Sequence, residues 1–270
     1  MNLTGRAYLI EPMFLRKAFL SSMAGVLVLI SMPASSETID LLPHRAVYEM
    51  TLDSGGDAIG LVSVHGGLVI EVEDRCETWS VQQRVLIQIL REDGGLVTTS
   101  TYDSFEAKDG TWYRFEDETN NDPGPTERSS GEAVAATELG SGSITIEEPE
   151  VSRHDMPQEA IFPMEHMSDI LVRALAGERF MSHVIFDGTD GATVNDVTTI
   201  VGKAETIDGQ TAWNMRLAFF DHGSPEELPN VEINALLRDD GVALELAFDY
   251  GDFTIRSELR ELETLVGGGC

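Results

Sequence analysis

The sequence predicts a mainly β protein, with a single long, curved antiparallel sheet wrapped around one amphipathic helix. Several runs of residues alternate between apolar and polar side chains with a period of two, which is typical of strands. Asp-Gly turns separate these runs, and one segment has the apolar spacing of a helix. Because a sheet and an amphipathic helix must bury their apolar faces together, the simplest arrangement is a strongly curved sheet around the helix.

The first 36 residues have the three parts of a signal peptide. Arg16 and Lys17 form a basic region, and an uncharged, largely apolar run follows over residues 18–32. Small residues come next, and Ala34 and Ser36 fit the −3 and −1 positions of a cleavage site. We therefore expect cleavage after Ser36 and export from the cytoplasm.

Two alternatives concern this first segment. An uncleaved membrane anchor would need an apolar run of ~20 residues, which is longer than the run present here. Translation from Met13 instead of Met1 would give a more ordinary basic region. No cysteine lies near the cleavage site to carry a lipid, and no later segment is long and apolar enough to span a bilayer. We expect no stable membrane insertion after signal cleavage.

The predicted mature chain is strongly acidic. Residues 1–36 hold three basic residues and one acidic residue, which leaves 15 Lys and Arg against 46 Asp and Glu. This balance repels nucleic acid and anionic membrane surfaces, so we expect no nucleic-acid partner. A solvated shell of carboxylates, as in proteins adapted to a saline environment, is favoured over an acidic binding site.

Three runs have the clearest strand pattern, because alternate side chains of a strand point to opposite faces. Their apolar faces are Ala46, Tyr48, Met50 and Leu52; Trp213, Met215, Leu217 and Phe219; and Val242, Leu244, Leu246, Phe248 and Tyr250. Tight turns are expected at Asp93-Gly94-Gly95, Asp109-Gly110, Asp208-Gly209 and Asp240-Gly241. Roughly a dozen short strands fit between Arg45 and Leu262.

One helix is predicted over residues 164–176. Its apolar stripe consists of Met164, Met167, Leu171, Ala174 and Leu175. Pro163 at its start and Gly177 just past its end are the usual boundary residues. Residues 149–163 are expected to be irregular, and residues 120–130 are expected to form an exposed loop. Residues 37–270 are expected to form a single domain.

The two cysteines are Cys76 and Cys270. In an oxidising compartment such a pair is most simply a disulfide, which would tether the C-terminus to an early strand. Free or intermolecular thiols are the alternative. The absence of a Cys-x-x-Cys motif argues against thiol–disulfide exchange.

No catalytic, cofactor-binding or metal-binding site is predicted. The six histidines lack the spacing of a metal pair on a helix, and no phosphate-binding glycine loop is present. Gly140-Ser141-Gly142-Ser143-Ile144 differs from a nucleophile elbow and is more typical of a turn entering a strand. A hydrolase that uses His44 or His166 with a nearby carboxylate is the remaining enzymatic alternative.

The predicted helix carries a weak signal for an apolar groove. Methionine adapts to irregular apolar partners, and a curved sheet around this helix could leave space for a lipid or acyl chain. The groove would be lined by Met164, Met167, Leu171 and Leu175. Ordinary core packing is the alternative interpretation.

Several motifs, taken in order, resemble the EipB cell-envelope integrity family. The first is the segment 42–48, which contains Pro43, His44 and Arg45, and the second is Cys76-Glu77-Thr78-Trp79. The others are Phe162-Pro163-Met164-Glu165-His166, Phe186-Asp187-Gly188 and the C-terminal Cys270. The resemblance extends from about residue 41 to residue 270.

This resemblance implies a periplasmic protein with a β-spiral fold, whose shape is similar to that of periplasmic lipoprotein carriers. It implies a disulfide between Cys76 and Cys270. It also implies a role in maintaining the cell envelope, with no established enzyme activity. We therefore expect a non-enzymatic protein that binds a partner, either an envelope protein or a lipid. A carrier or sensor of acyl chains is the alternative function.

Overall fold

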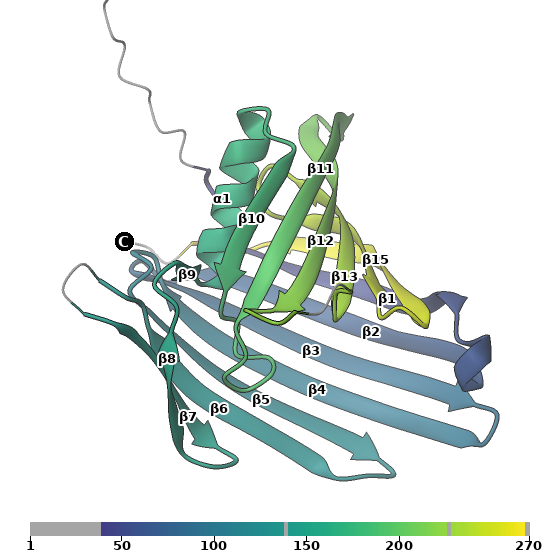
Figure 1. The fold of residues 1–270 in the computed structure, drawn as a ribbon. Helices are drawn as coiled ribbons and strands as arrows, with labels where there is room; N and C mark the ends of the chain where they lie inside the picture. The colour runs from purple at the N-terminus through teal and green to yellow at the C-terminus, as the bar shows by residue number, and fades with distance from the viewer. Residues whose placement is uncertain (1–38, 138–139, 226–227, 268–270) are drawn as a thin grey trace, which may run out of the picture. The chain divides into compact units, whose positions relative to one another are not determined.

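The computed structural model describes residues 39–137, 140–225 and 228–267, which lie in one compact unit. All strands of this described part belong to one fifteen-stranded sheet, and its α-helix is α1 (Figure 1). The sheet order is β8-β7-β6-β5-β4-β3-β2-β1-β15-β14-β13-β12-β11-β10-β9. Neighbouring strands are antiparallel, except that β9 and β10 pair in parallel.

The first half of the chain contains β1 (His44–Gly55), the short 3-10 helix η1 (Asp57–Ile59), β2 (Leu61–Asp74), β3 (Thr78–Arg91), β4 (Gly94–Ala107), β5 (Trp112–Asp122), β6 (Thr126–Val134) and β7 (Gly142–Glu148). The second half contains β8 (Ser152–Met156), β9 (Ala160–Ile161), α1 (Pro163–Leu175), β10 (Phe180–Ile185), β11 (Asn195–Ile207), β12 (Gln210–Asp221), β13 (Val231–Arg238), β14 (Ala243–Asp249) and β15 (Phe253–Thr264).

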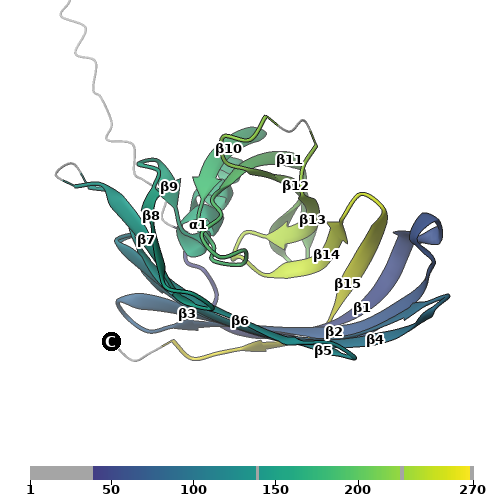
Figure 2. The ribbon, with the colours of Figure 1, turned by 60° about the horizontal axis from the view of Figure 1, so that its bottom comes forward.

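The sheet is strongly curved around the helix. Strands β1 to β6 form an extended layer, and strands β10 to β14 curl over its concave side (Figure 2). Helix α1 lies on the inner side of this curl, next to β10 (Figures 1 and 2). The predicted architecture, one curved sheet around one amphipathic helix, is confirmed.

The period-two pattern sets which side chains face inward. In β1, Ala46, Tyr48 and Met50 are buried, while Arg45 and Glu49 are exposed. All four predicted Asp-Gly turns join consecutive strands of the sheet. The left-handed φ of Asp208 (51°) and Gly209 (85°) is the geometry that a two-residue hairpin turn requires.

Strand β14 departs from the predicted alternation. Its pairing with β13 shifts register between Leu236 and Leu237, so that Leu244 is an extra residue. Ala243 then faces the interior together with Leu246 and Phe248, whereas Leu244 does not. The sequence pattern missed this because a bulge changes the alternation without changing composition.

Two segments predicted to be irregular contain strands. Residues 120–130 were expected to be a loop but form the ends of β5 and β6, and only residues 123–125 connect these strands. Residues 149–163 contain β8 and β9. Both predictions were wrong because pairing with neighbouring strands outweighs the weak local propensity of polar and proline-containing segments.

Helix α1 begins and ends where the sequence predicts. Pro163 is its first residue, Ala176 caps its C-terminus, and Gly177 follows with a φ of 92°. The buried residues of the helix are Met164, His166, Ile170, Leu171 and Ala174. The apolar residues among them pack in a core with Trp213 and Met215 of β12 and with Ala235 and Leu237 of β13.

The predicted signal peptide (residues 1–36) and Cys270 lie outside the described residues. Cys76 lies exposed in the turn between β2 and β3. Within the described part of the chain, no helix has the length and apolar character needed to cross a membrane.

The disulfide between Cys76 and Cys270 remains a prediction that thiol counting can test. We expect the exported protein to have no titratable thiol under denaturing conditions until it is reduced. A cross-link over this long loop stabilises by at most about 5 kcal/mol. Cys76→Ser, Cys270→Ser and the double variant should therefore lose the same amount of unfolding free energy. Unequal or additive losses would show that the two cysteines do not pair.

Candidate functional site

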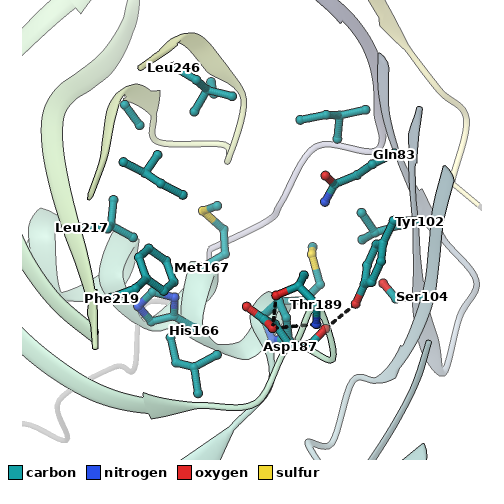
Figure 3. Close-up of a pocket in the computed structure, with 18 of the residues that line it drawn as sticks. Gln83, Tyr102, Ser104, His166, Met167, Asp187, Thr189, Leu217, Phe219 and Leu246 are labelled. Atoms are coloured by element: carbon teal, nitrogen blue, oxygen red, sulfur yellow. Dashed lines mark hydrogen bonds between the residues drawn. The ribbon is translucent and has the colours of Figure 1, made fainter. Parts of the chain in front are cut away.

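A cavity of about 640 Å³ lies inside the curve of the sheet. Its volume falls within the range of roughly 300–1,000 Å³ that small-molecule sites usually have. Figure 3 shows side chains from the helix, from the extended layer and from the curled strands pointing toward this space. The cavity is therefore enclosed by parts of the chain that are far apart in sequence.

Most of the cavity wall is apolar, because it is built from inward-facing strand positions. Strand β13 contributes Val231, Ile233, Ala235 and Leu237, which alternate along the strand. The extended layer contributes Leu68, Ile70 and Val72 from β2. Helix α1 contributes Met164, Met167 and Ile170. These surfaces can hold an apolar ligand without leaving polar groups unpaired.

The four residues of the predicted groove occupy different positions. Met164 and Met167 line the cavity. Leu171 is fully buried in the core between the helix and the sheet and does not line it. Leu175 is 42 % exposed at the end of the helix. The helical spacing is regular, but the cavity meets only residues 163–170 of the helix, and Ile170 is the last residue of the helix that lines it.

Glu106 fixes the N-terminus of α1. This residue lies on β4 and is only 3 % exposed. Its carboxylate accepts hydrogen bonds of 2.7 Å from the backbone N–H groups of Met164 and Glu165. Phe162, the residue in the N-cap position, has no side chain that could accept them. Glu106 thus satisfies two of the helix donors that would otherwise be buried without a partner.

Burial also shifts the ionisation of Glu106. Its pKa rises to about 7 because the charged carboxylate loses solvation, although the two backbone hydrogen bonds act in the opposite direction. The side chain lines the cavity. Near neutral pH, Glu106 therefore exists in both its charged and its neutral form.

His166 has a buried polar atom without a hydrogen-bond partner in the described part of the chain. The residue lines the cavity (Figure 3) and is 6 % exposed. Burial, and secondarily His183, lowers the pKa of His166 to about 3, so the ring is neutral at pH 7. Its Nε2 atom has no hydrogen-bond partner among the described residues. A ligand or a water molecule can supply this missing partner.

His44 also lines the cavity and is buried. Its Nδ1 atom lies 2.7 Å from the carbonyl oxygen of Leu42, which fixes the ring orientation. Burial lowers the pKa of His44, and the nearby Asp240 partly opposes this shift. Arg238 forms a two-point ion pair with Asp240, so the negative charge of Asp240 is balanced by the guanidinium group.

Two buried tyrosines join the extended layer to the loop after β10. The hydroxyl groups of Tyr102 and Tyr113 contact each other, and both donate toward the carbonyl oxygen of Asp187 (Figure 3 shows the bond of Tyr102). Burial raises the pKa of both tyrosines, which stay protonated. Gly188 then packs so closely on Phe115 that a Cβ atom would lie 2.5 Å from its ring. These contacts explain the glycine at position 188.

The remaining motif residues support this arrangement. Pro43 accepts a hydrogen bond from Leu265 just before β1, and Arg45 is exposed, 3.7 Å from Glu71. Phe162 is fully buried, and its ring stacks on Tyr113 at 5.3 Å. Pro163 begins the helix and lines the cavity. The motif residues near the helix are therefore structural or cavity-lining.

A serine nucleophile needs a hydrogen bond to a histidine base, and no such pair is found among the lining residues that the structure describes. Among the described residues, the hydrogen bond between a serine and a histidine joins Ser152 and His154, which lie on β8 and do not line the cavity. The same part of the chain holds no group of three His, Cys, Asp or Glu side chains arranged to bind a metal ion.

Comparison with known proteins places this fold among bacterial relatives. Residues 35–266 match the family model described as EipB-like. The chain is 28 % identical to the cell envelope integrity protein EipB of Brucella abortus over 245 residues, which cover 85 % of this chain and 86 % of that protein. A crystal structure from Brucella abortus, described as a beta-barrel-like protein with a domain of unknown function, matches with a TM-score of 0.79. It is 26 % identical, and the match covers 84 % of this chain and all of that one.

The raised pKa of Glu106 predicts a pH-dependent contribution to stability. Above its ordinary value of 4.5 the unfolded chain releases a proton that the folded protein retains, so this contribution is full below pH 4.5 and is lost as the pH rises through 7. Relative to Glu106→Gln, which cannot ionise, the wild type should lose about 3 kcal/mol of unfolding free energy over this interval. Urea denaturation between pH 4.5 and 8 measures the difference.

Glu116→Gln is the matched control for this experiment. Glu116 lies exposed on the neighbouring strand β5, so its substitution should give a difference from wild type that hardly changes with pH. A pH-independent difference between wild type and Glu106→Gln would contradict the assignment.

Proposed function

Since the chain belongs to the EipB-like family, we propose that it is a non-enzymatic periplasmic protein that supports the integrity of the cell envelope. We propose further that it does so by binding the acyl chain of a lipid or of a lipoprotein in the cavity. The observation that carries this proposal is the apolar cavity of about 640 Å³ beside α1. The name of the Brucella abortus relative supports the envelope role.

The chemistry of the cavity supports an apolar ligand. Aliphatic and methionine side chains from α1, β2 and β13 line the cavity, so an acyl chain inside it contacts apolar side chains of three elements. Burial of apolar surface contributes roughly 0.8 kcal/mol for each CH₂ group. Methionine side chains adapt to chains of different shape, which suits Met164 and Met167 for this role.

Binding is favoured over catalysis because the polar groups of the cavity are engaged in structural roles. Glu106 caps the helix, and Tyr102 and Tyr113 hold the loop after β10. His166 has an unpaired Nε2, but no hydrogen bond of the described residues joins it to a nucleophile. A general base needs its reaction partner within hydrogen-bond reach.

The periplasmic location is supported by the predicted signal peptide over residues 1–36 and by the envelope role of the relative. The predicted disulfide between Cys76 and Cys270 suits the same oxidising compartment. An acyl chain in this compartment would arrive on a lipid or on a lipid-modified protein. The two partner classes, lipid and envelope protein, are therefore compatible with one cavity.

Narrowing the cavity should weaken ligand binding. Leu217 of β12 points into the cavity (Figure 3) and is half-buried. We expect Leu217→Trp to weaken the binding of a fluorescent monoacylglycerol at least tenfold, because the indole occupies the space of the chain. Fluorescence titration of the purified protein measures the affinity, and circular dichroism checks the fold.

Leu86→Trp is the matched control, because Leu86 is 51 % exposed on β3 and does not line the cavity. It should bind like the wild type. Native mass spectrometry of protein taken from its own envelope should show a bound lipid that Leu217→Trp lacks. If the wild type binds no acyl probe and carries no lipid, acyl-chain binding is wrong.

A further inference from the structure

One end of the cavity is polar and open to solvent. Several of the lining residues at this end are also exposed, namely Thr189, Asp190, Asp221 and Asn230. They come from the loop between β10 and β11 and from the turn between β12 and β13. The register places these connections together, because Asn195 at the start of β11 pairs with Asp221 at the end of β12. This end is the mouth of the cavity.

The opposite end is covered by the segment before β1. The N–H group of Leu42 donates to the carbonyl oxygen of Asp240, which fixes this segment against the turn between β13 and β14. A Cβ atom on Gly241 would lie 2.9 Å from the side chain of Leu41, so the two packed segments leave little space between them. A ligand head group therefore belongs at the mouth.

The mouth carries carboxylates without compensating cations. Asp187, Asp190 and Asp221 line it, and none of them forms an ion pair with a Lys or Arg of the described residues. Their hydrogen bonds come from uncharged neighbours: Thr189 donates to Asp187, Thr193 to Asp190 and Asn230 to Asp221. None of the described cavity-lining residues is a Lys or an Arg.

A second observation points to a ligand in the same cavity. His166 lines the cavity, and its Nε2 atom is buried with no hydrogen-bond partner among the described residues. A purely apolar core would not keep such an atom, since an unsatisfied buried polar group costs free energy.

We infer that the cavity selects amphiphiles whose head group is uncharged or positively charged, and that it discriminates against anionic head groups. This inference rests on the proposed function, because it presupposes that the cavity holds an acyl chain. Three carboxylates around the mouth repel a carboxylate or phosphate head group and attract an ammonium group. No Lys or Arg among the described lining residues reverses this preference.

The test compares three probes with the same fourteen-carbon chain. They are monomyristoylglycerol, which is uncharged, tetradecylamine, which is positively charged at neutral pH, and myristate, which is negatively charged. Each probe displaces the fluorescent monoacylglycerol from the purified protein at low ionic strength and below its micelle concentration. We expect myristate to bind about tenfold more weakly than monomyristoylglycerol, and tetradecylamine to bind at least as tightly. Added salt should narrow the gap.

Two triple variants separate the mouth from the acidic surface as a whole. Asp187→Asn, Asp190→Asn and Asp221→Asn together should remove most of the discrimination against myristate. Asp93→Asn, Glu116→Gln and Glu150→Gln change the net charge equally at exposed positions outside the cavity lining, and should leave it intact.

The outcomes distinguish the two proposals. Equal or tighter binding of myristate by the wild type overturns the head-group inference and leaves acyl-chain binding standing. If both triple variants reduce the discrimination against myristate equally, the net charge of the protein causes it, and the proposed role of the three mouth carboxylates is wrong. If none of the three probes binds, the proposed function itself fails.

Discussion

The fold depends on how the buried N-terminus of α1 is satisfied. When a helix begins inside a curved sheet, its first N–H groups are surrounded by protein and cannot bond to water. Burying such donors without a hydrogen-bond partner costs folding free energy. Glu106 resolves this from β4 through its bonds to Met164 and Glu165. The helix is thereby tied to the extended layer at its start, while its buried face packs against β12 and β13.

The cavity follows from this placement. Helix α1 packs on the curled strands, and the aromatic cluster around Tyr113, Phe162 and Phe186 fills the space beside its N-terminus. The tyrosine hydroxyls meanwhile hold the loop after β10 to the extended layer. Residues within the range 163–170 of the thirteen-residue helix line the space that is left, whereas its last residues do not. The unfilled remainder is the lined space between β2 and β13.

Local patterns were enough to predict the sheet and the helix, but not the site. Period two in β1 and helical spacing after Pro163 are encoded within a few turns of chain, so both were predicted correctly. Glu106 stands 58 residues from its partner Met164 and is one of 47 acidic residues. Nothing near it in sequence distinguishes it, because its role arises only when β4 meets α1. The bulge at Leu244 and the strand β8 were missed for the same reason, since pairing decides them.

The acidic composition has two parts that the sequence cannot separate. Many carboxylates, such as Glu116, are exposed, which agrees with a solvated shell. In the sequence, Asp187, Asp190 and Asp221 look like any other acidic residues, but the fold brings them together around the entrance to an apolar cavity. Charge on the outer face affects solubility and long-range encounter, whereas charge at an entrance acts on whichever group remains there after the apolar chain is buried. The preference for a head group therefore depends on where the carboxylates lie and not on how many carboxylates the chain contains.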